Sequence, residues 1–364
     1  MEYNNFDALN FIRIFINSYM RFLFIILFTI LFYGCPDPDD GDTNPQNCGS
    51  IDYYDLYLEG IPIPEEFVFN SEHLNNIDVI NQVYTLTTDS SLSSENANSI
   101  NDAYLFFQEN SIANINNWYV MLSAPHSQRM YRYPDGETET HSTELYTGAI
   151  AEFMNSQLGV PALCSKYKSD DPNYHDYIPA ITETPYFIDG NHQNDVIPFK
   201  QKISDYILSS DNKINIVLDL HGFISENYDQ SSTIDCGDYD VSTNDASGDI
   251  IIGTLCGSSL QSDLGCYIPE IIEHIFSEHG IVDVSIGSGE FQAIVNQTVT
   301  KYVINDIDGS SDKLLDALQI EIDDKYRYGL ENSAYRIQFI NALSETIYVL
   351  NYLYDVMISN ENSM

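Results

Sequence analysis

Residues 118–158 read WYVMLSAPHSQRMYRYPDGETETHSTELYTGAIAEFMNSQL, and most of what the chain reveals begins in this segment. The apolar run from Trp118 to Leu122 predicts a buried strand. The strand ends close to Pro125, because proline has no N–H group to donate to a sheet. His126 follows, and we therefore expect it at the carboxyl end of the strand, where open α/β sheets place their ligands.

The second half of this segment predicts a helix that presents a carboxylate. Ser142 or Thr143 suits the N-cap position, and Gly159 suits the residue that ends the helix. Glu144 is then expected in the first turn. One face of the helix carries the apolar residues Ile150, Phe153, Met154 and Leu158.

The stretch from Ile214 to Phe223, INIVLDLHGF, repeats this design of an apolar run that ends at a histidine. In a strand, Asp219 and His221 point to the same side. Two strand ends thus each present a histidine, and Glu144 lies between them in sequence. Two histidines and one carboxylate, with a fourth position open, form the ligand set of a catalytic zinc site. Asp219 is a candidate for the residue that orients His221, although its place in the strand also allows it to be buried elsewhere.

This ligand set has alternatives. A lone histidine after a strand is more often a structural residue, and the chain has no HxxH or HExxH signature that would fix the ligands. Glu137, Glu139 and His141 compete with Glu144 for the third ligand position.

A series of short motifs resembles those of the bacterial N-formylglutamate amidohydrolase-like proteins, which belong to the wider zinc-dependent carboxypeptidase-like hydrolases. In order along the chain, the motifs are APHSQRMYRY…TELYTGAIAEFM, SDDPNYHD, PFKQKI, IVLDLHGF, IIGTLCG and LQIEIDDKYR. They span roughly residues 117–328, a little over half of the chain. The resemblance implies an α/β fold with a mixed, mostly parallel sheet flanked by helices, of the phosphorylase/hydrolase-like and zinc carboxypeptidase-like type.

The resemblance also implies the site. Carried over residue by residue, it places one zinc ion per chain on His126, Glu144 and His221, and it assigns the acid of the QxE motif to Glu321. It places Asn173 at the rim of the site as a candidate substrate contact, with a plain turn as the alternative.

One position departs from the family pattern. Relatives often carry a second histidine four residues after the first, and Met130 occupies that position here. Because a thioether is a poor zinc ligand, this departure favours an alternative in which the protein is a catalytically inactive surface lipoprotein that uses the hydrolase fold for binding.

Composition excludes several classes of protein. The 364 residues include 14 Lys and Arg against 55 Asp and Glu, which gives a formal net charge of −41. A nucleic-acid-binding surface needs positive charge, as does a surface that adheres to anionic lipid, so both are excluded. With 27 Tyr and 18 Phe the chain nevertheless has the apolar content of a folded protein.

Residues 1–34 predict a targeting signal. Arg21 precedes an apolar run over residues 22–33, which is shorter than the roughly 20 residues a membrane span needs. Cys35 follows directly, as in bacterial lipoprotein signals, and predicts an exported protein that is held at the cell envelope by a lipid on this cysteine. An ordinary signal peptide and an N-terminal anchor without lipid are alternatives, and either Met1 or Met20 is the start.

The remaining chain divides into three predicted parts. Residues 36–50 form an acidic linker, residues 51–117 form a β-rich lead-in or a small added subdomain, and residues 118–359 form the hydrolase-like domain. The cysteines beyond the linker's start are Cys48, Cys164, Cys236, Cys256 and Cys266. In an exported protein, two of the last three are expected to form a disulfide.

These observations predict an exported zinc hydrolase that cleaves an amide or peptide C–N bond of a small acidic or peptide-like substrate. Glu321 acts as general acid and base. Arg129 is a candidate partner for a substrate carboxylate, with a structural salt bridge as the alternative. Lys200 is a candidate partner for an anionic substrate group, with a solvated helix residue as the alternative.

Overall fold

The computed structural model describes residues 51–86, 104–107, 117–127, 130–132, 139–141, 144–165, 198–209, 212–224, 248–286, 293, 298–307, 314–328 and 333–361. The chain divides into two units, Met1–Asn47 and Cys48–Met364, and all described residues belong to the second. The predicted targeting signal, Cys35 and the acidic linker lie outside the described residues. Within those ranges, no helix is both long and apolar enough to cross a membrane.

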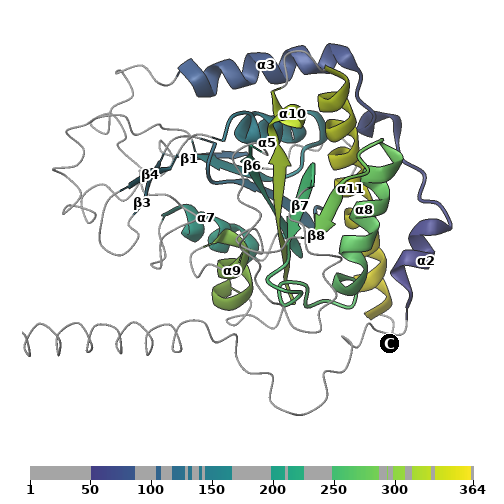
Figure 1. The fold of residues 1–364 in the computed structure, drawn as a ribbon. Coiled ribbons are helices and arrows are strands. Elements are labelled where there is room, and N and C mark those ends of the chain that lie inside the picture. The colour runs from purple at the N-terminus through teal and green to yellow at the C-terminus, as the bar shows by residue number, and fades with distance from the viewer. Residues whose placement is uncertain are drawn as a thin grey trace, which may run out of the picture. The chain divides into compact units, whose positions relative to one another are not determined.

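The second unit is built on a sheet of seven strands (Figure 1). In spatial order these are β1 (Tyr104–Phe107), β5 (Ala162–Ser165), β2 (Val120–Ala124), β6 (Ile216–Phe223), β9 (Asp316–Asp323), β7 (Ile250–Gly253) and β8 (Val284–Ile286). The pairs β1–β5 and β7–β9 are antiparallel, and the other four neighbouring pairs are parallel. The predicted mixed, mostly parallel sheet is therefore confirmed. A separate two-stranded sheet pairs β3 (Met130–Arg132) with β4 (Glu139–His141).

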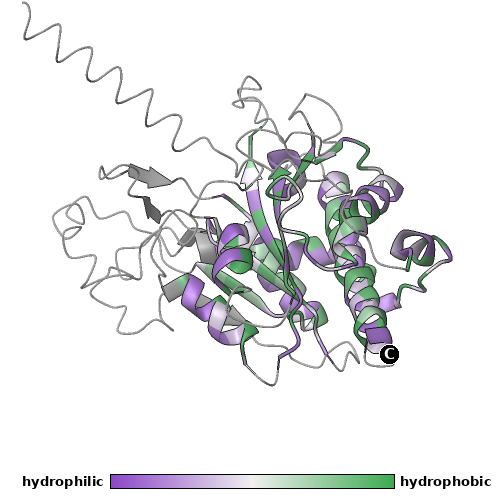
Figure 2. Cartoon of the chain, turned by 90° about the horizontal axis from the view of Figure 1, so that it is seen from below, coloured by the Kyte–Doolittle hydropathy of each residue, from purple (hydrophilic) through white to green (hydrophobic). Residues whose placement is uncertain are grey.

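Helices cover both faces of the main sheet. In Figure 1, α7 (Pro198–Ile207) and α9 (Val299–Tyr302) lie on one side, and α8 (Ile268–Glu278) and α11 (Ser333–Glu361) lie on the other. The central strands are buried from both directions; β2 and the first part of β6 are apolar runs, whereas β9 (DALQIEID) alternates polar and hydrophobic residues. Figure 2 shows these hydrophobic residues along the strands and hydrophilic residues mixed into the flanking helices. Three short elements lie between these helices and strands, namely η8 (Gly265–Tyr267), η10 (Val303–Ile307) and α10 (Asp324–Arg327).

The helix after β2 begins later than the sequence predicts. Neither Ser142 nor Thr143 caps it, since α5 covers Thr147–Leu158 and its N-cap residue is Tyr146, with a left-handed φ of 72°. Glu144 therefore lies in the turn before the helix rather than in its first turn. The predicted end is correct, because Gly159 adopts φ 86° at the C-cap.

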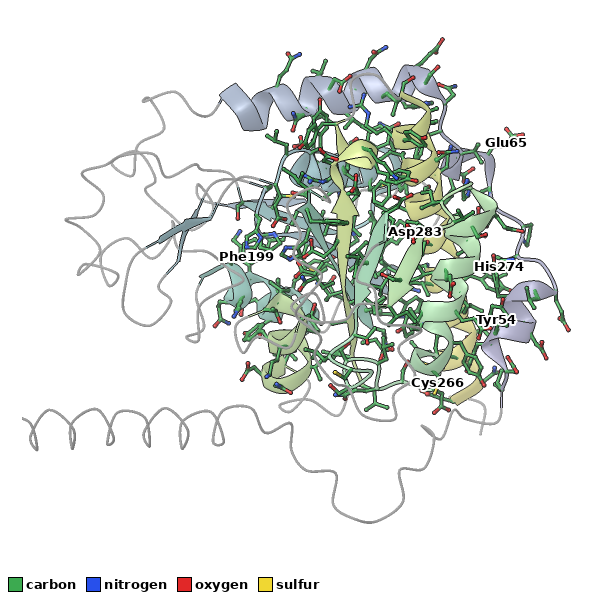
Figure 3. All side chains as sticks on the ribbon, in the orientation of Figure 1. Tyr54, Glu65, Phe199, Cys266, His274 and Asp283 are labelled. Atoms are coloured by element: carbon green, nitrogen blue, oxygen red, sulfur yellow. The ribbon has the colours of Figure 1, made fainter. Side chains whose placement is uncertain are left out.

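Residues 51–117 are mostly helical where they are described, so the expected β-rich character is wrong. Its described residues contain α2 (Tyr53–Leu58), η1 (Glu65–Phe67) and α3 (Ser71–Leu86), and among them only the strand β1 joins the sheet. Helix α2 packs on α8, where the hydroxyl of Tyr54 lies 3.3 Å from Nδ1 of His274 (Figure 3).

The cysteines follow the expected chemistry of an oxidised chain. Cys256 and Cys266 are each disulfide-bonded. Cys164 on β5 is buried, and its Sγ lies 3.7 Å from the carbonyl oxygen of Gly148.

Candidate metal centre

Three parallel strands bring the predicted site residues to one edge of the sheet. Strands β2, β6 and β9 are neighbours, so their carboxyl ends meet there. His221 on β6 pairs in register with Glu321 on β9, and Asp219 pairs with Gln319. Because paired residues on neighbouring strands point to the same side, these four side chains share one face of the sheet.

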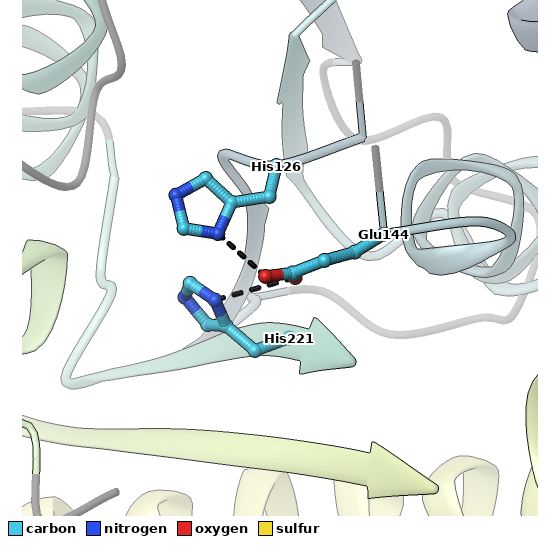
Figure 4. A group of neighbouring side chains, drawn as sticks. All are labelled: His126, Glu144 and His221. Carbon is cyan, nitrogen blue, oxygen red and sulfur yellow. Dashed lines mark hydrogen bonds and ion pairs between the residues drawn. The ribbon is translucent and has the colours of Figure 1, made fainter. Parts of the chain in front are cut away.

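His126, Glu144 and His221 converge on one point (Figure 4). The Glu144 carboxylate lies between the two imidazoles, with Oε1 at 2.7 Å from Nδ1 of His126 and Oε2 at 3.4 Å from Nδ1 of His221. One potential ligand atom from each residue lies within 4.8 Å of the others, and all three residues are buried. This is the group that the sequence predicted.

The main chain holds this carboxylate in place. The N–H of Glu144 donates to the carbonyl of His126 at 2.9 Å, and Oε2 accepts from the N–H of Gly222 at 2.9 Å. The carbonyl of Glu144 accepts from the hydroxyl of Thr147 at 2.8 Å. The turn before α5 is thus fastened both to the end of β2 and to the end of β6.

Asp219 contacts His221, on the same side of the strand, as the alternation of the sequence predicts. Its Oδ2 lies 3.0 Å from Nε2 of His221 and accepts a hydrogen bond from that nitrogen. Once the proton sits on Nε2, the lone pair of Nδ1 is directed toward Glu144. A ligating histidine whose second nitrogen donates to a carboxylate is the usual arrangement in protein metal sites.

The electrostatics of the cluster favour separated charges. Burial by itself raises the pKa of Glu144, but the charges of His126 and His221 outweigh it and hold this pKa well below its usual value. Burial by itself lowers the pKa of His221, but Asp219 and Glu144 outweigh it and hold this pKa well above its usual value. The metal-free site is therefore an ionised carboxylate that shares a proton with imidazole, and a cation that binds there replaces that proton.

Glu321 lies beside this cluster, and its pKa is shifted in the opposite direction to that of Glu144. Burial raises its pKa to about 7, with His221 opposing the shift and Glu144 adding to it. Its Oε1 accepts a hydrogen bond of 2.7 Å from the side-chain amide of Gln319. A carboxyl group that titrates near neutral pH is suited to take and return a proton.

The donor set fits one metal ion. Two imidazole nitrogens, which are borderline ligands, and one carboxylate oxygen, which is a hard ligand, form a set of three donors that is compatible with zinc and with other divalent transition metals. Glu321 accepts from Gln319 through Oε1 and does not belong to the group whose potential ligand atoms converge. His126, Glu144 and His221 could therefore hold one metal ion, and the other coordination positions would be open to water or substrate.

Other predicted residues are placed only in part. Arg129, Glu137 and Asn173 lie outside the described residues. Glu139 and His141 belong to β4, where His141 pairs with Met130 of β3.

Lys200 is not the solvated residue that one interpretation expected. It is 2% exposed on α7, and its Nζ lies 5.6 Å from the centre of the Tyr302 ring.

Sequence reasoning gave no role to Gly222 or Arg327, although both touch the site. Gly222 donates its N–H to Glu144, and the guanidinium group of Arg327 lies where a Cβ atom on Gly222 would project. The one signal was the glycine itself, since glycine inside a strand often marks the close approach of another group.

No family model and no curated protein matches the chain. Among solved structures, the chain is similar to the crystal structure of N-formylglutamate amidohydrolase from Ralstonia eutropha JMP134. The match covers 70% of this chain and 99% of that chain, with 14% sequence identity and a TM-score of 0.38.

Proposed function

We propose that this protein is an exported, zinc-dependent hydrolase that cleaves an amide or peptide C–N bond. The observation that carries the proposal is the buried group of His126, Glu144 and His221, with Glu321 beside it on the neighbouring strand. The first three supply the ligands of a catalytic metal, and the fourth supplies a base with a pKa of about 7.

Each residue has a distinct role in the proposed reaction. Bound zinc supplies a Lewis acid that polarises the scissile carbonyl and acidifies water. Glu321 accepts a proton from the attacking water and returns it to the leaving nitrogen, so that the C–N bond breaks to a carboxylate and an amine. Asp219 keeps the proton of His221 on Nε2 throughout.

The proposed substrate class is based on the predicted location of the protein outside the cytoplasm and on the positive charge of Arg129. The predicted lipoprotein signal and the disulfide-bonded Cys256 and Cys266 support an extracytoplasmic protein anchored at the envelope through Cys35. Peptide-like substrates with an acidic group suit that location, with Arg129 as the proposed partner of the substrate carboxylate.

Metal content is the first test. We expect about one zinc ion per chain when the protein is purified without a metal-affinity tag and analysed by plasma mass spectrometry. His126→Ala and His221→Ala should each lose the metal. His274→Ala is the matched control, because this histidine lies on α8 and contacts Tyr54 rather than the site.

A parent protein that stays metal-free after incubation with zinc would sink the hydrolase proposal. Met130, at the family's second histidine position, would then favour the alternative of a surface lipoprotein that binds a ligand without turnover. If zinc is bound, release of amine from short acidic peptides and N-acylated amino acids is the second measurement.

A further inference from the structure

Arg327 occupies an unusual position for an arginine. It is the last residue of α10, the short helix that directly follows β9, and it is only 2% exposed. All three nitrogens of its guanidinium group donate to main-chain carbonyls. Nε donates to Ile322 at 2.8 Å, Nη1 donates to Leu145 at 2.8 Å, and Nη2 donates to Phe223 at 2.7 Å.

These three carbonyls belong to the three chain segments that carry Glu144, His221 and Glu321. Leu145 directly follows the ligand Glu144, Phe223 is two residues after the ligand His221, and Ile322 directly follows the base Glu321. The segments lie far apart in sequence, since the hydrogen bonds to Leu145 and Phe223 span 182 and 104 residues. One side chain therefore ties together the main chain next to a carboxylate ligand, an imidazole ligand and the base.

The chain makes room for this arrangement. A Cβ atom at Gly222 would lie 2.3 Å from Cζ of Arg327, which no packing could accept without displacing the guanidinium group. The same glycine donates its N–H to Oε2 of Glu144. Because Gly222 has no side chain, the guanidinium group of Arg327 can pack directly against the main chain next to His221.

The charge of Arg327 is also buried beside the site. Burial lowers the pKa of Arg327, and the nearby Glu144 carboxylate opposes that shift. Arginine stays protonated in proteins, so its three hydrogen bonds to carbonyl oxygens are charge-assisted.

We infer that Arg327 is a positioning residue of the metal centre, which fixes the spacing between Glu144 and His221 through the carbonyls of Leu145 and Phe223. It touches neither metal nor substrate and acts through the main chain. This inference rests on the proposed function, because it presupposes that these residues bind a metal.

The test is the zinc affinity of the full protein, measured by competition with a chromophoric chelator. Arg327→Met and Arg327→Lys should each bind zinc about 10- to 100-fold more weakly than the parent, as is typical when a group that orients a ligand is lost. Lysine keeps the charge, but its three N–H donors share one nitrogen, so it cannot reproduce the planar fork with which arginine reaches the three carbonyls. The d–d absorption of the cobalt-loaded variants should also shift, since the ligand geometry relaxes.

Arg336→Met is the matched control. Arg336 is also buried, at 7% exposure, but it binds the carboxylate of Asp78 at 2.7 Å and donates to none of the three carbonyls. This variant should lose thermal stability without changing zinc affinity or the cobalt spectrum. Arg327→Lys is the variant that keeps the test valid if Arg327→Met does not fold.

The outcomes separate the two ideas. Zinc affinity of folded Arg327 variants within twofold of a zinc-binding parent would overturn the inference and leave the proposed function intact. A parent that binds no zinc at all would overturn the proposed function and this inference with it.

Discussion

Replacing Glu321 by glutamine is expected to abolish turnover and, at the same time, to stabilise the metal-free protein. The substitution preserves the size of the side chain and the oxygen that accepts the Gln319 hydrogen bond. It removes the proton acceptor, and loss of a general base costs about 10²- to 10⁴-fold in rate. That loss corresponds to about 3 to 5 kcal/mol in activation free energy.

The change in stability follows from the pKa. Burial raises the pKa of Glu321 from 4.5 to about 7 in the folded protein. The folded state therefore binds an extra proton between these two pH values, and the free energy of unfolding falls as the pH rises through that window. Above it the penalty is complete, on the order of 3 kcal/mol. The glutamine variant avoids this penalty, so it should be more stable than the parent by up to that amount at pH 8, and equally stable at pH 4.

The assay combines urea denaturation of the metal-free proteins at pH 4, 6 and 8 with zinc analysis and turnover. Glu278→Gln, an exposed change on α8, is the control and should alter none of the three. Zinc content should stay at the parent level in the Glu321 variant. Loss of zinc would show that Glu321 is a ligand and refute the assigned role. A variant no more stable than the parent at pH 8 would refute the reasoning from burial.

Two further predictions concern buried carboxylates. Asp219→Asn should weaken zinc binding about 10- to 100-fold in the chelator competition, because the carboxylate no longer holds the His221 proton on Nε2; unchanged affinity would exclude that role. Asp316→Asn should lower the free energy of unfolding by about 3 kcal/mol in urea at pH 8, because Asp316 accepts from the Gln261 and Ser262 main chain and from two hydroxyls, and an amide group would oppose some of those donors. The exposed Asp263→Asn is its control, and a difference below about 1 kcal/mol between them would contradict this account.

Much of the site could be predicted because its residues stand where strands end. Apolar runs marked β2 and β6, and a histidine after each run was a local signal. Strand alternation was enough to put Asp219 beside His221. Glu321 could be predicted as a site residue only through the resemblance to a known family. The sequence of its strand does not show that His221 is its neighbour on the adjacent strand.

The start of α5 and the role of Arg327 were missed for two different physical reasons. The start of α5 was misplaced because Tyr146 adopts a left-handed conformation that its residue type does not announce. Arg327 was missed because its partners are main-chain carbonyls, which every residue carries and which leave no mark in the sequence. Contacts of this kind become visible only when the chain has been placed in space.

The pairing of β6 with β9 also bears on the order of events during folding. Asp219 and Gln319 are direct neighbours in this parallel pair, although 100 positions separate them in the chain (319 minus 219). Parallel pairing over such a distance requires closure of a long loop, and the entropy cost of that closure precedes the favourable contacts between the strands. We therefore expect this pairing to be a slow, late step of folding. His221 and Glu321 become neighbours only in that step. Metal uptake is therefore expected to follow the folding of this chain and not to initiate it, unlike in small zinc domains that fold around their ion.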